Sequence, residues 1–132
     1  KELRIQWRVD ARKLKANDKA VVSPPFEISP GYPGSYRMIL KPTATKFRGG
    51  STFKNSNGRG SVQFKCENES DSAITFRISI GDGRPGGRHI ASRGPVQHNF
   101  ALGSVCGLPK AQEEWDFMTA VDEASNTFVV SL

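Results

Sequence analysis

Residues 73–81 read AITFRISIG, and this stretch decides the fold class. Its large apolar residues, at positions 74, 76, 78 and 80, alternate with Thr75, Arg77 and Ser79. Successive side chains of a strand point to opposite faces of a sheet, so strict alternation predicts one buried face and one solvated face. A sheet that is wetted on one side is typical of antiparallel β-proteins.

The same two-residue period recurs along the rest of the chain. It is found in residues 5–9, 36–41, 62–66 and 128–132, with shorter apolar pieces at 21–22 and 26–28. Pro24-Pro25 interrupts the two short pieces, and turn-forming pairs such as Asn57-Gly58 separate the longer ones. We therefore expect an all-β fold, an antiparallel β-sandwich of about seven to eight strands.

One stretch has a helical character. Residues 111–120 contain good helix formers, with Glu113 and Glu114 early in the segment, where acidic side chains suit a helix N-terminus. Pro109 lies just before it, at a position that fits a helix start. The sequence predicts one short helix over residues 111–120.

The length of 132 residues suits a single domain over residues 1–132. The chain begins with Lys1 rather than Met, so we expect it to be part of a longer protein. No window approaches the roughly 18 consecutive apolar residues of a membrane span, so no membrane insertion is expected. Cys66 and Cys106 are too few for a disulfide scaffold, and we expect reduced thiols in an intracellular, cytoplasmic domain.

The formal net charge of +6 is unevenly distributed. Residues 1–65 hold 14 Lys and Arg against 4 Asp and Glu, whereas residues 66–132 hold 5 against 9. A basic first half can attract a polyanion such as nucleic acid, although a soluble domain with a dipolar surface has the same composition.

Signatures of catalysis are sparse. Two Cys and two His at scattered spacing do not resemble a zinc site, which needs about four such ligands. Residues 81–87 are rich in Gly but lack the Lys of a phosphate-binding loop. We expect no enzymatic activity, no cofactor and no metal.

Several segments, in this order, resemble a MATH domain, the TRAF-like β-sandwich. The matching segments are residues 5–9 with Trp7, 23–28, 36–42, 60–66, 73–83, Phe100, 114–117 and 126–132. Residues 114–117 are similar to the family's Trp-Gly-Phe element, with Asp116 in place of the Gly.

The resemblance implies a binding module of a TRAF-like family rather than an enzyme. MATH domains take short extended peptides in a groove beside an edge strand, as in TRAF adaptors, ubiquitin-ligase adaptors of the BTB type and a deubiquitinase. We therefore expect an adaptor or substrate-recognition domain of the ubiquitin pathway, with a protein partner that supplies a short peptide motif. The peptide-binding positions that the resemblance implies are Trp115, Phe117, Glu114, Phe76, His98 and Ser61.

Three alternatives stay open. Packing in the core would equally explain Trp115 and Phe117, and Phe76 shares a face with Ile74 and Ile78. A basic β-domain would bind nucleic acid or another polyanion through Arg48, Lys54, Arg59, Arg84, Arg88 and Arg93. A self-associating structural domain is the third, since TRAF-like domains can form trimers.

Overall fold

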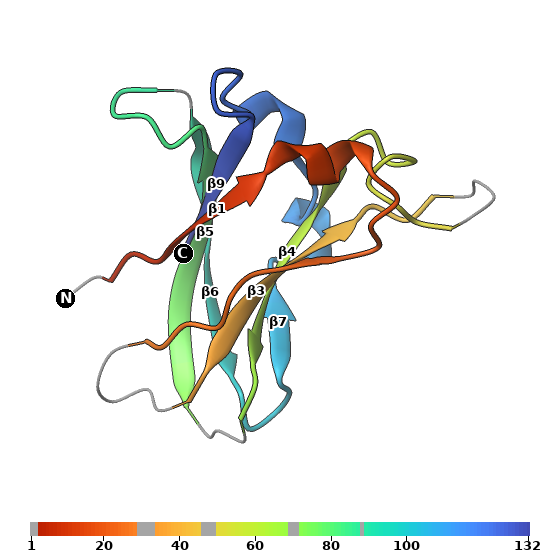
Figure 1. The fold of residues 1–132 in the computed structure, drawn as a ribbon. Helices are drawn as coiled ribbons and strands as arrows, with labels where there is room; N and C mark the ends of the chain where they lie inside the picture. The colour runs from red at the N-terminus through yellow and green to blue at the C-terminus, as the bar shows by residue number, and fades with distance from the viewer. Residues whose placement is uncertain (1–2, 29–33, 46–49, 69–71, 88) are drawn as a thin grey trace.

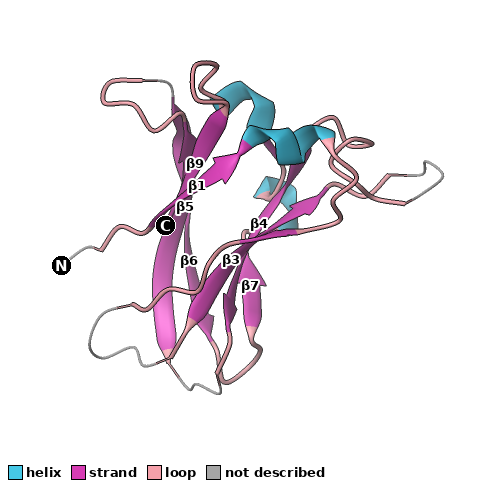
Figure 2. Ribbon diagram, in the orientation of Figure 1, coloured by secondary structure: helices cyan, strands magenta, loops and turns pink. Residues whose placement is uncertain are grey.

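A computed structural model describes residues 3–28, 34–45, 50–68, 72–87 and 89–132, with only the backbone at His89. Two antiparallel sheets face each other across one core (Figure 1). Strands dominate the described residues, and the helical segments among them are short 3-10 turns (Figure 2). The predicted all-β sandwich is therefore confirmed.

The first sheet has four strands. In spatial order they are β1 (Gln6–Asp10), β9 (Thr127–Ser131), β5 (Ala73–Gly81) and β6 (His89–Asn99). Strand β5 coincides with the alternating stretch from which the fold was predicted. Its residues at positions 74, 76, 78 and 80 are buried, as the alternation requires.

The second sheet faces the first. Its order is β2 (Val21–Val22), β3 (Tyr36–Pro42), β4 (Arg59–Cys66) and β7 (Val105–Gly107), and the short β8 (Trp115–Asp116) also pairs with β4. An aromatic cluster joins the two sheets around Phe64. The rings of Tyr36, Phe76 and Phe100 have centroids 5.3, 5.4 and 5.6 Å from that of Phe64.

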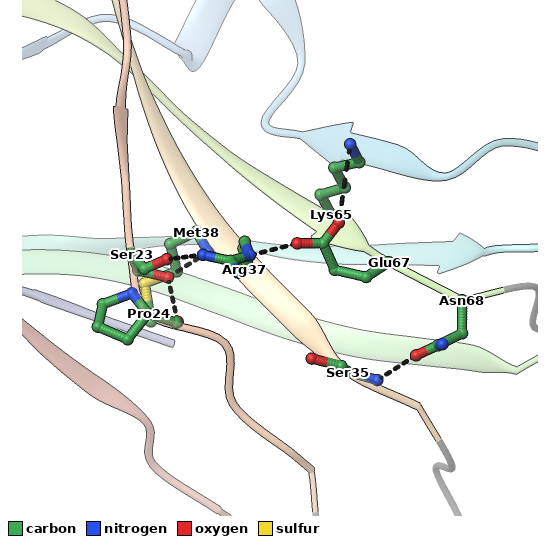
Figure 3. A network of polar contacts seen from close by, with 8 residues as sticks. All are labelled: Ser23, Pro24, Ser35, Arg37, Met38, Lys65, Glu67 and Asn68. Atoms are coloured by element: carbon green, nitrogen blue, oxygen red, sulfur yellow. Dashed lines mark hydrogen bonds and ion pairs between the residues drawn. The ribbon is translucent and has the colours of Figure 1, made fainter.

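The break at Pro24-Pro25 is compensated by a buried hydroxyl (Figure 3). The Ser23 hydroxyl accepts a hydrogen bond from the Met38 amide at 2.9 Å and donates to the Pro24 carbonyl at 2.8 Å. Arg37 donates to the Ser23 carbonyl at 2.9 Å and forms an ion pair with Glu67. Ser23 thus holds the chain against β3 where proline cannot donate a ladder bond.

The prediction of one helix over residues 111–120 is wrong. The structure has two 3-10 turns, η2 (Lys110–Gln112) and η3 (Phe117–Ala120), with β8 between them; a third, η1 (Ala11–Lys15), follows β1. Trp115 and Phe117 are both fully buried. Residues two apart lie on the same side of a strand but on different sides of a helix, so burial of this pair favours extended backbone.

The predicted turn at Asn57-Gly58 is present. Both residues have left-handed backbone, with φ of 56° and 76°. This turn leads into β4, and its Gly58 carbonyl accepts a hydrogen bond from the Phe117 amide at 3.1 Å. The turn therefore helps to fix the position of η3.

Candidate functional site

The two aromatic residues expected to line a peptide groove have no accessible surface. Trp115 lies in β8 opposite Gly60 of β4, and Phe117 begins η3. The relative exposure of each side chain is 0%. In this structure both residues pack in the core, which was the alternative interpretation.

Arg93 covers Trp115 from the facing sheet. Its guanidinium lies 3.7 Å from the centroid of the indole ring. One guanidinium nitrogen also donates to the carbonyls of Gln112 (2.9 Å) and Glu114 (2.6 Å). These contacts link β6 to the η2–β8 segment and close this edge of the sandwich.

The other four predicted residues do not form one site. Glu114 is exposed and accepts a hydrogen bond from the Thr43 hydroxyl at 2.9 Å. Ser61 is half-buried on β4, opposite Lys41.

Phe76 and His98 lie on the first sheet instead. Phe76 is opposite Val96, and His98 is opposite Ile74, further along the β5–β6 ladder. His98 Nε2 lies 2.8 Å from the Gly103 carbonyl oxygen, which ties the imidazole to the turn that follows β6. The six residues are therefore divided among different parts of the sandwich.

Three of the six candidate polyanion-binding residues are engaged by protein groups. Arg48 and Arg88 lie outside the described residues. Arg59 forms ion pairs with Glu114 and Asp116, at 3.9 and 3.5 Å. Arg84 forms an ion pair with Asp122 at 2.8 Å. Arg93 contacts the Trp115 ring and donates to two backbone carbonyls. Lys54 is exposed. These pairings weigh against a continuous basic surface made by this set.

An opening lies beside β5. Strand β9 pairs with Ser79–Gly81, whereas β5 begins at Ala73, so most of β5 continues past the end of β9. Figure 1 shows β5 extending beyond the C-terminus while the segment before β1 leaves the sheet to one side. A cavity of about 690 Å³ occupies this place.

The lining of this cavity has two parts. Its apolar wall is formed by Leu3, Ile5, Ile28, Phe64, Ile74, Phe76, Pro95 and Leu132. Its polar part is formed by Arg4, Thr75, Arg77, Ser79, Ser92 and Ser131. The cavity thus runs from the outer face of the first sheet, past the side of β5, to the interior between the sheets.

The backbone of β5 is oriented toward this cavity at alternate residues. The Phe100 amide donates to the Ser72 carbonyl at 3.0 Å, which shows that even-numbered residues of this stretch face β6. Thr75 and Arg77 therefore direct their N–H and C=O groups to the opposite side. Within the described residues, no β-partner is found for them there.

The resemblance implied Phe76 as a peptide-binding position but did not indicate the cavity beside which it lies. Thr75 and Arg77 were predicted to be solvent-facing, which they are, and nothing in that pattern distinguished them from other outward residues. The opening depends on where β9 ends relative to β5, and no local signal encodes that register.

Cys106 is not activated as a nucleophile. Burial raises the pKa of its thiol to about 12, so it is protonated at neutral pH, and the thiolate is the reactive form. Both cysteines are free. Among the described residues, no group of three or more His, Cys, Asp or Glu side chains is placed to hold a metal ion, and no helix is long and apolar enough to cross a bilayer.

No protein-family model matches the chain, and no curated protein sequence matches it significantly.

Proposed function

We propose that this domain is a protein-interaction module that binds an extended peptide as an added strand along β5. The observation that carries the proposal is the stretch of β5 beyond β9, where Thr75 and Arg77 face a cavity of about 690 Å³. Backbone groups at a sheet edge are a template for pairing with another chain.

The lining of the cavity suits an added strand. A guest strand would satisfy the backbone groups of Thr75 and Arg77 while every second side chain entered the apolar wall near Phe64 and Phe76. Main-chain bonds would supply general affinity, and the pocket would select side chains.

The resemblance to MATH domains supports the same class of function, and membership of that family is part of the proposal. Those domains bind extended peptides beside an edge strand and act as adaptors or substrate-recognition modules. Trp115 and Phe117 are buried here, so the proposed groove is at β5 instead. Of the six positions implied by the resemblance, Phe76 is the one that lines it.

Proline substitution tests the proposal at the backbone. Thr75→Pro removes the amide hydrogen that faces the cavity, whereas the β5–β6 ladder keeps its bonds at the neighbouring residues. Gln97→Pro is the matched control, since Gln97 lies opposite Thr75 and directs its own amide away from β5. The binding probe is a fluorescein-labelled pool of octapeptides with Val or Ile at alternate central positions.

We expect the pool to bind the parent chain and the Gln97→Pro variant but not Thr75→Pro. Circular dichroism and thermal unfolding of all three establish that each is folded. Hydrogen exchange provides a second readout that needs no variant: the Thr75 and Arg77 amides should become protected when the pool is added. Unchanged exchange at both amides under saturating peptide would refute the proposal.

A further inference from the structure

We infer that the preferred peptide carries an acidic residue first, then apolar residues at its second and fourth positions, and runs in the direction of β9. This inference rests on the proposed function, because it specifies the guest strand that the β5 opening would take. It follows from the register of the sheet and from two arginines at the rim, Arg4 and Arg77.

The register places each guest residue. Ser131 of β9 lies opposite Ser79 of β5, and Val130 lies opposite Ile80. Each step toward the end of β9 is therefore a step back along β5. A strand that continues this register past Leu132 would place its four residues opposite, in turn, Arg77, Phe76, Thr75 and Ile74.

The faces of the sheet then decide the polarity of each guest side chain. Phe76 and Ile74 are buried, whereas Arg77 and Thr75 are exposed. Directly opposed residues in an antiparallel pair lie on the same face. The first and third guest side chains would point to solvent, and the second and fourth would enter the cavity near Phe64.

Two cations flank the first guest position. Leu132 and Ile5 exchange two backbone hydrogen bonds, of 2.9 and 3.3 Å, so Arg4 is the next residue on that side. Arg77 flanks the position on the other side, and its Nε donates to the Ser92 hydroxyl at 2.8 Å on the outer face of the sheet. A carboxylate between two cross-strand arginines is favoured, and an ammonium there is disfavoured.

The direction follows from the two neighbours. Strands β1 and β5 are both antiparallel to β9. A guest that runs along the direction of β9 therefore makes antiparallel pairs on β5, which are slightly more stable than parallel pairs.

The test uses three labelled octapeptides with identical Gly and Ser flanks. Their central residues are Glu-Val-Thr-Val, Lys-Val-Thr-Val and the reversed order Val-Thr-Val-Glu. Fluorescence anisotropy measures binding to the 132-residue chain, with hydrogen exchange at Thr75 and Arg77 measured in parallel. We expect the Glu peptide to bind about three- to tenfold more tightly than either of the others, with the difference reduced by salt.

Charge reversal provides the decisive comparison. Arg77→Glu should invert the preference, so that the Lys peptide binds more tightly. Lys54→Glu is the control, because it makes the same charge change at an exposed position outside the cavity lining. It should leave the preference for Glu unchanged.

The outcomes separate the two proposals. Equal binding of the Glu and Lys peptides, with both amides protected, would overturn the acidic motif and leave strand addition standing. Absence of protection with every peptide would overturn both. A second copy of the chain is the competing occupant. It would exclude the free peptides and overturn the inference, and light scattering would identify it.

Discussion

The guanidinium of Arg93 lies 3.7 Å from the centroid of the Trp115 ring, and this contact joins the edges of the two sheets. Arg93 comes from β6, whereas Trp115 comes from β8. The same guanidinium donates to the carbonyls of Gln112 and Glu114. One side chain therefore buries an indole and satisfies two backbone acceptors.

Replacement of Arg93 by Ala should destabilise the fold by about 2 kcal/mol, from the lost cation–π contact and hydrogen bonds. It should also expose the Trp115 indole, so its fluorescence emission should shift to longer wavelength. The measurement is urea unfolding monitored by fluorescence in a Trp7→Phe background, since the chain has two Trp. Arg93→Lys, which keeps the charge but loses the planar fork, should be intermediate. Unchanged emission in Arg93→Ala would contradict the covering role.

Gly60 permits the close approach of β4 to β3. A Cβ at this position would lie 2.1 Å from the Lys41 carbonyl oxygen and 3.1 Å from the Phe53 ring. Gly60→Ala should therefore cost about 2–3 kcal/mol in the free energy of unfolding, because a backbone atom must move. Gly103→Ala is the control, since nothing lies within 4 Å of its Cβ. Chemical denaturation measures the free energy of unfolding of both variants. Similar denaturation midpoints for the two would show that β3 and β4 can separate freely at Gly60.

The Ser23 hydroxyl should contribute measurably to the free energy of unfolding. It is buried, with 2% exposure, and bonds both the Met38 amide and the Pro24 carbonyl. Ser23→Ala leaves the Met38 amide without this acceptor, so the free energy of unfolding should fall by about 1–2 kcal/mol. Ser61→Ala, at a half-buried position on β4, should change it far less. Thermal unfolding of the pair measures the contrast, and equal melting temperatures would argue against a structural role for this hydroxyl.

The Cys106 thiol should make stability depend on pH at the alkaline end. Burial raises its pKa from the ordinary value of 9.0 to about 12. The unfolded chain releases this proton near pH 9, whereas the native state retains it. The contribution of the group to stability is therefore complete below pH 9 and is lost as the pH rises from 9 toward 12.

Comparison with Cys106→Ala isolates this effect from the titration of Lys and Tyr. The parent chain should lose stability more steeply than the variant between pH 9 and pH 12. Urea midpoints measured at half-unit intervals provide the two curves. Parallel curves would mean that the native thiol ionises as readily as the unfolded one.

Much of the fold could be predicted from local patterns. Residues 73–81 were expected to form a strand with one buried face, and β5 has those bounds and that burial. The alternation in residues 36–41 and 62–66 likewise fell within β3 and β4. The segment 111–120 was misread because its composition favours helix, whereas burial of Trp115 and Phe117 against neighbouring strands favours extended backbone.

The candidate site was less predictable. The resemblance implied Trp115 as a groove residue, but its exposure is decided by Arg93, which reaches it from the other sheet. Similarly, alternation placed Thr75 and Arg77 on the solvent side of β5 without indicating that their backbone faces an opening. Both properties depend on contacts between distant segments.

By itself the sequence determined that the chain forms an antiparallel sandwich, because a two-residue apolar period can bury one face only in a sheet. Tertiary structure alone decided which aromatic residues are covered and where β9 ends along β5. The physical reason is that periodicity acts between neighbouring residues, whereas strand register and the closure of a sandwich edge are set by packing between segments far apart in the chain.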